Sequence, residues 1–239
     1  MQFGCRVELE NLDSFDRLDK YSAVPIELAL PYQKDRFLKE RHKIPELISY
    51  IDKNNIRINS IHATQGKLTD DDFLVWGADA LKLSKEYSGV TVVIHPGRFY
   101  EKKSEISRNK AQKIALENIR KLCEIYVPRL AMETFGGDRY LFSPDEIMEY
   151  KLPMVLDIAH QDENKSLEII QLYHQNIKVI HLSAIKGHKH HLPINDFCLM
   201  ALDQMNDYGF SGTVTLEYLP EYHHRLVEDC LKLIKRYEI

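Results

Sequence analysis

The chain has 239 residues, 44% of them hydrophobic, and carries a formal net charge of −4 from 32 basic and 36 acidic side chains. This length and apolar content favour one large domain spanning residues 1–239. The charge balance lacks the basic excess typical of nucleic-acid-binding proteins, so a nucleic-acid partner is not favoured.

The cysteine pattern and the N-terminal segment bear on the compartment. Four cysteines, Cys5, Cys123, Cys198 and Cys230, show neither C-x-x-C spacing nor a disulfide framework, so they are expected to be small apolar residues in a reducing compartment. Residues 1–13 lack the basic and apolar regions of a signal peptide, and no apolar stretch reaches the about 18 residues of a membrane span. We therefore expect a cytoplasmic protein without a membrane partner, and its oligomeric state stays open.

Eight short segments rich in Val, Ile and Leu recur along the chain, roughly one per 30 residues. Their polar and apolar residues do not alternate cleanly, which is typical of parallel strands buried on both faces. The segments occupy residues 3–9, 23–30, 58–64, 89–97, 128–137, 153–160, 177–184 and 212–220.

Longer amphipathic segments lie between the predicted strands. Residues 11–22 hold one short helix at most. Ser143 as N-cap, followed by Pro144 and acidic residues, predicts a helix over 143–150. Apolar residues at helical spacing predict four more helices, over residues 113–126, 166–175, 196–209 and 224–237.

Eight strands alternating with helices predict an α/β fold of the (β/α)8 class, a TIM barrel in a single domain. A doubly wound open sheet is the competing fold, and it often carries a Gly-rich phosphate loop. The sequence contains no G-x-G-x-x-G or Walker-type segment, so the barrel is favoured.

The predicted strands end in residues that can bind metal. Six consecutive segments supply, in order, His62, His95, Glu133, Asp157, His181 and Glu217. In a barrel these ends form one mouth, and carboxylates buried there are costly unless they are paired or bind a cation. The set therefore predicts a metal site. Taken singly, Glu133 and Asp157 could cap turns, and His62 could be an ordinary core histidine.

Several of these strand ends share short motifs with a known family: METFGG (132–137), VLDIAH (155–160), VIHLS (179–183) with HLPI (191–194), and GTVTLE (212–217). They resemble the xylose isomerase-like barrels, which comprise sugar and sugar-phosphate isomerases and epimerases together with endonuclease IV. The resemblance implies that Glu133, Asp157, His181 and Glu217 bind a metal ion. It also places His160 and His191 at the mouth, and HPG at 95–97 resembles the fourth strand of both branches.

The favoured hypothesis is a metal-dependent sugar or sugar-phosphate isomerase or epimerase. Three carboxylates and one imidazole favour Mn²⁺, Mg²⁺ or Co²⁺, which would stabilise an enediolate next to the substrate carbonyl. By resemblance to related epimerases, Glu133 and Glu217 would transfer the proton on opposite faces of the carbon, and His160 would bind a substrate oxygen. Arg98 or Lys186 could hold a phosphate or a distal hydroxyl, although either could be plain surface.

An endonuclease IV-like zinc phosphodiesterase acting on DNA is the alternative. The resemblance would then give three zinc ions the ligands His62, His95, Glu133, Asp157, His160, His181, His191 and Glu217. Against it, Lys189 stands where the resemblance calls for an aspartate, and the acidic segment after His62 lacks an aromatic wedge for a duplex. A barrel that binds a ligand without catalysis is the third hypothesis. His188 and His190 are expected to be loop residues.

Overall fold

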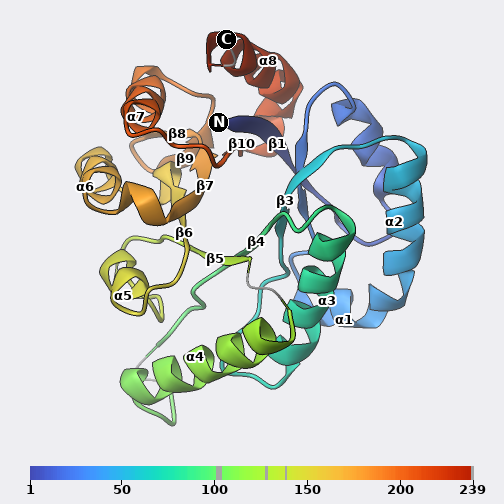
Figure 1. Ribbon diagram of the computed structural model, residues 1–239, viewed down its shortest axis with the longest axis vertical. Coiled ribbons are helices and arrows are strands. Elements are labelled where there is room, and N and C mark those ends of the chain that lie inside the picture. The colour runs from blue at the N-terminus through green and yellow to red at the C-terminus, as the bar shows by residue number, and fades with distance from the viewer. Residues whose placement is uncertain (101–103, 127–128, 138, 238–239) are drawn as a thin grey trace.

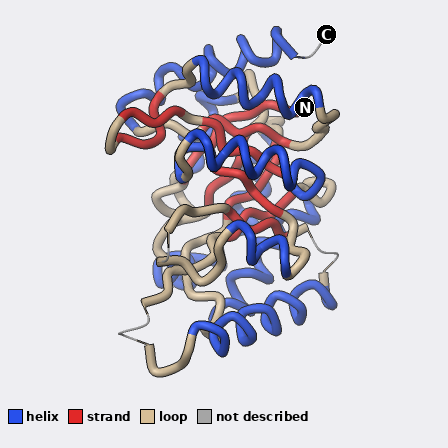
Figure 2. Tube along the Cα trace, turned by 90° about the vertical axis from the view of Figure 1, so that its left-hand side faces the viewer, coloured by secondary structure: helices blue, strands red, loops and turns tan. Residues whose placement is uncertain are grey.

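The computed structural model describes residues 1–100, 104–126, 129–137 and 139–237. Eight parallel strands close into a barrel in the order β1-β10-β7-β6-β5-β4-β3-β2. Their bounds are β1 Gln2–Glu8, β2 Ile26–Ala29, β3 Ile58–His62, β4 Thr91–Ile94, β5 Leu130–Glu133, β6 Met154–Asp157, β7 Ile177–Leu182 and β10 Thr213–Leu216. The strands lie at the centre, with the helices around them (Figures 1 and 2). The expected (β/α)8 barrel is confirmed.

The barrel strands are buried on both faces, as their near-continuous apolar sequences indicate. Every residue of β2, β5, β6 and β10 is buried. Each predicted strand segment overlaps one barrel strand; β1 begins one residue before its segment, and the segment 128–137 begins at Pro128, which lies outside the described residues.

Eight α-helices in the described residues cover the barrel: α1 Lys34–Glu40, α2 Ile44–Lys53, α3 Asp72–Glu86, α4 Arg108–Ile125, α5 Pro144–Glu149, α6 Glu163–Tyr173, α7 Asp196–Asp207 and α8 Leu226–Tyr237. All five predicted helices are present. At α5, Ser143 accepts a hydrogen bond from the Glu146 N–H, and the Glu146 side chain bonds back to the Ser143 N–H. This reciprocal capping box fixes the start of the helix where the sequence predicts it. The weak interval 11–22 holds only a 3-10 helix, Phe15–Tyr21.

One feature of the mouth differs from expectation. After β7 the chain forms an antiparallel hairpin of β8, Ala184–Lys186, and β9, Lys189–Leu192. His188 lies in its two-residue turn with Gly187, whose φ of 62° is readily adopted by glycine. The expectation that His190 is a loop residue is wrong, because it belongs to β9 and its ring Nδ1 lies 2.6 Å from the Ala159 carbonyl oxygen.

Two further observations concern the cysteines and the apolar character of the helices. All four cysteines are free thiols; Cys5, Cys198 and Cys230 are buried, and Cys123 is half-buried. Among the described residues, none of the helices has both the length and the apolar character needed to cross a bilayer.

Candidate metal centre

The pleat of the strands directs the predicted ligands to one place. A buried cluster of Val93, Ala131, Val155 and Val179 comes from β4 to β7. Because side chains two residues apart point to the same side of a strand, the residues two positions further on share that direction. They are His95, Glu133, Asp157 and His181. The apolar cluster therefore forms a layer below a polar layer at the carboxyl ends of the strands.

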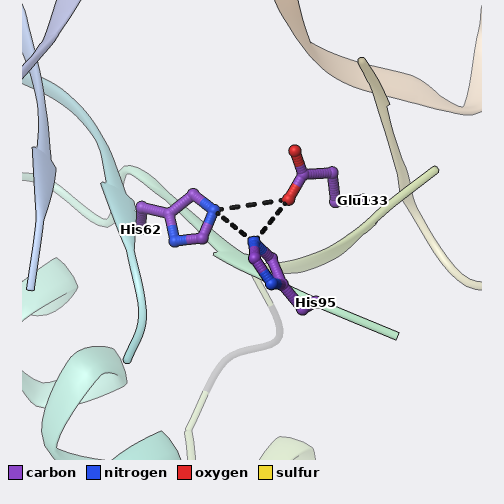
Figure 3. Close-up of side chains that lie close together, drawn as sticks. All are labelled: His62, His95 and Glu133. Atoms are coloured by element: carbon purple, nitrogen blue, oxygen red, sulfur yellow. Dashed lines mark hydrogen bonds and ion pairs between the residues drawn. The ribbon is translucent and has the colours of Figure 1, made fainter. Parts of the chain in front are cut away.

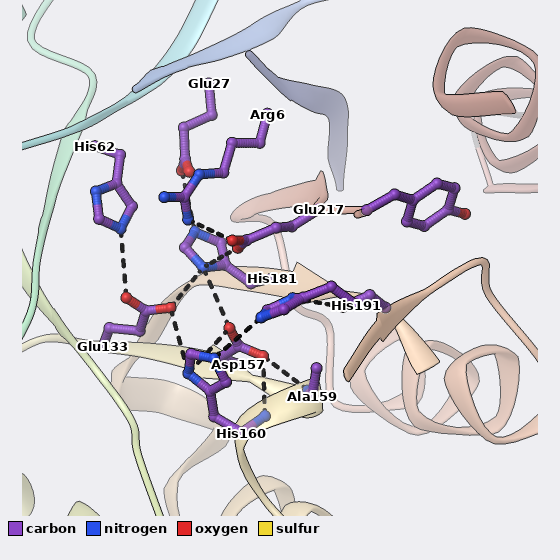
Figure 4. A network of polar contacts seen from close by, with 12 residues as sticks. Arg6, Glu27, His62, Glu133, Asp157, Ala159, His160, His181, His191 and Glu217 are labelled. Carbon is purple, nitrogen blue, oxygen red and sulfur yellow. Dashed lines mark hydrogen bonds and ion pairs between the residues drawn. The ribbon is translucent and has the colours of Figure 1, made fainter. Parts of the chain in front are cut away.

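The central group consists of Glu133, Asp157, His181 and Glu217, whose ligand atoms all lie within 4.8 Å of one another. His181 Nδ1 lies 3.0 Å from Glu133 Oε1, 3.3 Å from Glu217 Oε2 and 3.8 Å from Asp157 Oδ2 (Figure 4). The first three side chains are buried, and the Glu217 side chain is 17% exposed. The sequence-predicted ligands do meet around one point.

A second group joins His62 and His95 to the other oxygen of Glu133 (Figure 3). The two Nε2 atoms are 3.1 Å apart, and Glu133 Oε2 lies 2.9 Å from His95 Nε2 and 3.4 Å from His62 Nε2. Two ligands 2.0–2.1 Å from a tetrahedral zinc ion are about 3.3 Å apart. The three separations therefore suit donors around a single ion, and Glu133 is shared with the central group.

A third group consists of Asp157, His160 and His191. His160 Nε2 and His191 Nε2 are 3.1 Å apart, and His160 Nδ1 lies 3.4 Å from Asp157 Oδ2. Asp157 Oδ1 accepts backbone N–H bonds from Ala159 at 2.7 Å and from His160 at 3.2 Å, which starts the 3-10 helix Ile158–His160. Asp157 Oδ1 thus caps this turn, and Oδ2 is the oxygen that lies toward His160 and His181.

In four of the five imidazoles, the ring nitrogen that points away from the ligand groups contacts another polar atom. These contacts are His62 Nδ1 to the Ala63 carbonyl oxygen at 3.0 Å, His95 Nδ1 to Gln65 Nε2 at 2.6 Å, His191 Nδ1 to Ser183 Oγ at 3.2 Å, and His181 Nε2 to Glu27 Oε2 at 3.1 Å. The Ala63 carbonyl, the Ser183 hydroxyl and the Glu27 carboxylate can accept the ring proton and so leave the other nitrogen free for an ion, whereas the amide of Gln65 donates and only orients the His95 ring. In each case the nitrogen left over faces one of the three groups.

Arg6 and Glu27 belong to the same network, and sequence reasoning missed both. Arg6 Nη1 lies 2.7 Å from Glu217 Oε1, and Glu27 is fully buried beside His181. The available signal was a charged residue within each of the first two apolar segments, Arg6 in FGCRVEL, which also contains Glu8, and Glu27 in AVPIELAL. A charge in such a segment is expensive unless it has a buried partner.

The buried charges strongly influence one another. Burial by itself would raise the pKa of Glu133, but His95 and His181 outweigh it and hold this pKa well below its usual value. Burial likewise opposes ionisation of Glu217, yet Arg6 and His181 lower its pKa to about 2. For His181, burial favours the neutral ring, but Glu27 and Glu133 raise its pKa well above normal. Glu133 and Glu217 are therefore ionised and favour cations.

Several buried polar atoms in this network lack a hydrogen-bond partner. They are Glu27 Oε1, Asp157 Oδ2, Glu217 Oε2 and His160 Nδ1. Three of them, on Asp157, Glu217 and His160, belong to the side chains of the central and third groups. The network holds four carboxylates, Glu27 among them, and one guanidinium, so the chemistry of its donors fits divalent cations.

Two candidate residues lie outside the three groups. Arg98 is exposed and forms an isolated antiparallel bridge with Tyr140, whose ring stacks on Phe135 at 4.4 Å between ring centroids. Phe135 in turn packs on His160 at 4.1 Å, so Arg98 is near the mouth without touching the groups. Lys186 is exposed at the end of β8, and none of the contacts among the described residues joins it to them.

No family model matches the chain, and no curated protein matches it either. Solved structures do. They include 3-keto-D-glucoside 4-epimerase from E. coli (15% identity, 99% of each chain covered, TM-score 0.68) and endonuclease IV from Thermus thermophilus (15% identity, 100% and 99% covered, TM-score 0.62). A third is the IolI protein with a binding zinc atom (18% identity, 100% and 96% covered, TM-score 0.62). The chain thus has the fold of the xylose isomerase-like barrels, which confirms the expected resemblance at the level of fold.

Proposed function

We propose that the chain is a metal-dependent hydrolase of phosphate esters whose site binds at least two divalent ions. The observation that carries the proposal is the position of Glu133. Its Oε1 lies 3.0 Å from His181 in the central group, and its Oε2 lies 2.9 Å from His95 in the second group. A carboxylate placed in this way can bridge two ions, and neighbouring metal ions recur in phosphatases and nucleases.

The same contacts disfavour the two-base isomerase mechanism that the sequence suggests. A base must present an oxygen to the proton that it removes. Both oxygens of Glu133 face imidazoles, and Glu217 Oε1 is held by Arg6 at 2.7 Å while its Oε2 lies 3.3 Å from His181. Neither carboxylate is directed freely toward a substrate carbon.

The donor set favours zinc over magnesium. Five imidazoles contribute to the three groups, and imidazole suits zinc whereas magnesium prefers oxygen ligands. Solved structures with this fold include one with bound zinc. Held by these residues, such ions would supply Lewis-acid activation of water near neutral pH and positive charge for the ester oxygens. The protein's part is to hold the donors, with Glu133 and Asp157 each shared between two groups.

A single-metal isomerase or epimerase is the second candidate. Its support is the central four-ligand group with His160 beside it, and similar structures include sugar epimerases. In this case His62 and His95 would be substrate or structural contacts. Replacing His95 therefore separates the two candidates, because only the hydrolase needs it as a ligand.

The test uses protein purified without chelators and reloaded with zinc or manganese. Activity is measured on bis-p-nitrophenyl phosphate and on duplex DNA with an abasic site, and ketoses are incubated with the protein in D₂O. We expect phosphodiester cleavage that falls on His95→Ala and His191→Ala but not on His188→Ala, an exposed control in the hairpin turn. Deuterium incorporation into a ketose that survives His95→Ala, without cleavage of either ester, would refute the hydrolase and support the isomerase.

A further inference from the structure

We propose that Glu27 is a positioning residue that fixes the ring of His181, so that Nδ1 rather than Nε2 binds the ion of the central group. The inference rests on the metal-binding part of the proposed function and is independent of which reaction follows. Glu27 itself belongs to none of the three ligand groups.

The contacts at His181 divide the ring into two sides (Figure 4). On one side, Nδ1 is 3.0 Å from Glu133 Oε1 and 3.3 Å from Glu217 Oε2. On the other side, Nε2 is 3.1 Å from Glu27 Oε2. Both His181 and Glu27 are 0% exposed, so water does not replace either contact.

A neutral imidazole carries its proton on one nitrogen and its lone pair on the other. When an ion binds, the ring keeps one proton, and Glu27, which only accepts, holds that proton on Nε2. The lone pair then lies on Nδ1, facing the other ligands of the central group. Without that acceptor the ring could carry the proton on Nδ1, and the central group would lose a donor.

The register of the barrel holds Glu27 in place. Parallel pairing sets Arg6 of β1 opposite Glu27 of β2, and Glu27 opposite Ser60 of β3. Ser60 Oγ donates to the same Glu27 oxygen that accepts from His181, at 2.8 Å. Three neighbouring strands thus fix the carboxylate before any ion arrives, which is the preorganisation that an outer contact to a metal ligand needs.

A buried pair between Glu27 and His181 could also serve stability alone. The two roles differ in a measurable way, because a merely stabilising pair changes the melting temperature without changing zinc affinity. Asp79 provides the matched control. It is 6% exposed on α3 and pairs with Arg41 at 2.5 Å and 2.9 Å, and it belongs to none of the three groups.

Zinc occupancy is therefore measured in zinc-buffered solutions for the wild type and for Glu27→Ala, Glu27→Gln and Asp79→Ala. The zinc-binding step that is lost in Glu217→Ala is assigned to the central group, since Glu217 belongs to that group alone. We expect Glu27→Ala to weaken this step about 10–100-fold. Glu27→Gln, which keeps an accepting oxygen, should weaken it less, and Asp79→Ala should leave it unchanged.

A second measurement does not depend on any variant folding. In the zinc-loaded wild type labelled with ¹⁵N-histidine, long-range proton–nitrogen spectra should show His181 with a proton on Nε2 and a metal-bound Nδ1. A His181 ring bound through Nε2 would overturn the inference. Unchanged zinc affinity in folded Glu27→Ala would do the same, as would equal losses in the Gln and Ala variants. Zinc binding as expected, without ester cleavage, would leave this inference standing and refute the hydrolase alone.

Discussion

Zinc loading should raise the thermal stability of the protein by a large margin. The ligand network holds four carboxylates, Glu27, Glu133, Asp157 and Glu217, and one guanidinium, that of Arg6, which pairs with Glu217. Glu133 and Asp157 each have a second group of donors beside them, so one ion leaves part of this charge uncompensated. A ligand that binds the folded chain and not the unfolded one stabilises the fold by mass action.

The size of the effect follows from the affinity and the length of the chain. At free zinc about 1,000-fold above the dissociation constant, one site adds about 4 kcal/mol. For proteins of about 150–250 residues, 1 kcal/mol shifts the melting temperature by about 2–4 °C. One site therefore predicts a shift of about 8–16 °C. A second ion adds to it by less than the same amount, because the shared carboxylates couple the sites.

The assay is thermal unfolding followed by far-ultraviolet circular dichroism at fixed protein concentration. One sample is dialysed against a chelator and the other is equilibrated with buffered zinc, and bound zinc is counted by mass spectrometry. His188→Ala should show the full shift, whereas Glu133→Gln, which removes a carboxylate shared by two of the groups, should lose most of it. Zinc bound at two or more ions per chain with a shift under about 2 °C would mean that the ions bind elsewhere than in this buried network.

Three further predictions concern other parts of the molecule. His95→Ala should lower the zinc content by one ion per chain, and an unchanged count would remove the second group. Replacing both Lys186 and Lys189, exposed on the β8–β9 hairpin, with alanine should raise KM for a phosphodiester while kcat is kept, and added salt should reduce the difference. Burial opposes the ionisation of Glu146, but the Ser143 N–H, Gln112 and Arg108 together lower its pKa. The ionised Glu146 therefore stabilises the fold above its unfolded pKa of about 4.5. This stabilisation is lost as the pH falls through the lower pKa of the folded state. Urea unfolding between about pH 3 and pH 7 should show a smaller acid loss in Glu146→Gln, and an identical pH profile would contradict this.

The barrel could be predicted because burial on both faces makes the sequence of each strand almost continuously apolar. Eight apolar segments of similar spacing specify the topology once the (β/α)8 pattern is recognised. Helix α4 shows where this signal fails. Its first turn, Arg108–Gln112, is mostly polar, so hydrophobic periodicity starts only at residue 113, whereas the Ser107 N-cap marks the true start. The hairpin after β7 was missed because its residues 186–191 are polar and its shape depends on Gly187 and on contacts with Ala159.

The convergence of Glu133, Asp157 and His181 at the ends of β5, β6 and β7 could be predicted because strand period and barrel topology place them together without any knowledge of side-chain contacts. Glu27 could not be placed in the same way. Its partner His181 is 154 residues away in sequence, and only the closed barrel brings β2 close to β7 across the interior. The third group takes its carboxylate from Asp157, and Lys189 is exposed on β9.

Two shared carboxylates make the three groups one unit. Glu133 joins the second group to the central one, and Asp157 joins the third, so neither outer group is complete without a central ligand. His181 occupies the middle of this arrangement, and Glu27 sets its orientation from the opposite side of the ring. A different orientation of the His181 ring would therefore also disturb the outer groups, through Glu133 and Asp157. This dependence explains why a charge is placed inside β2, where an apolar residue would be the cheaper choice for the fold alone.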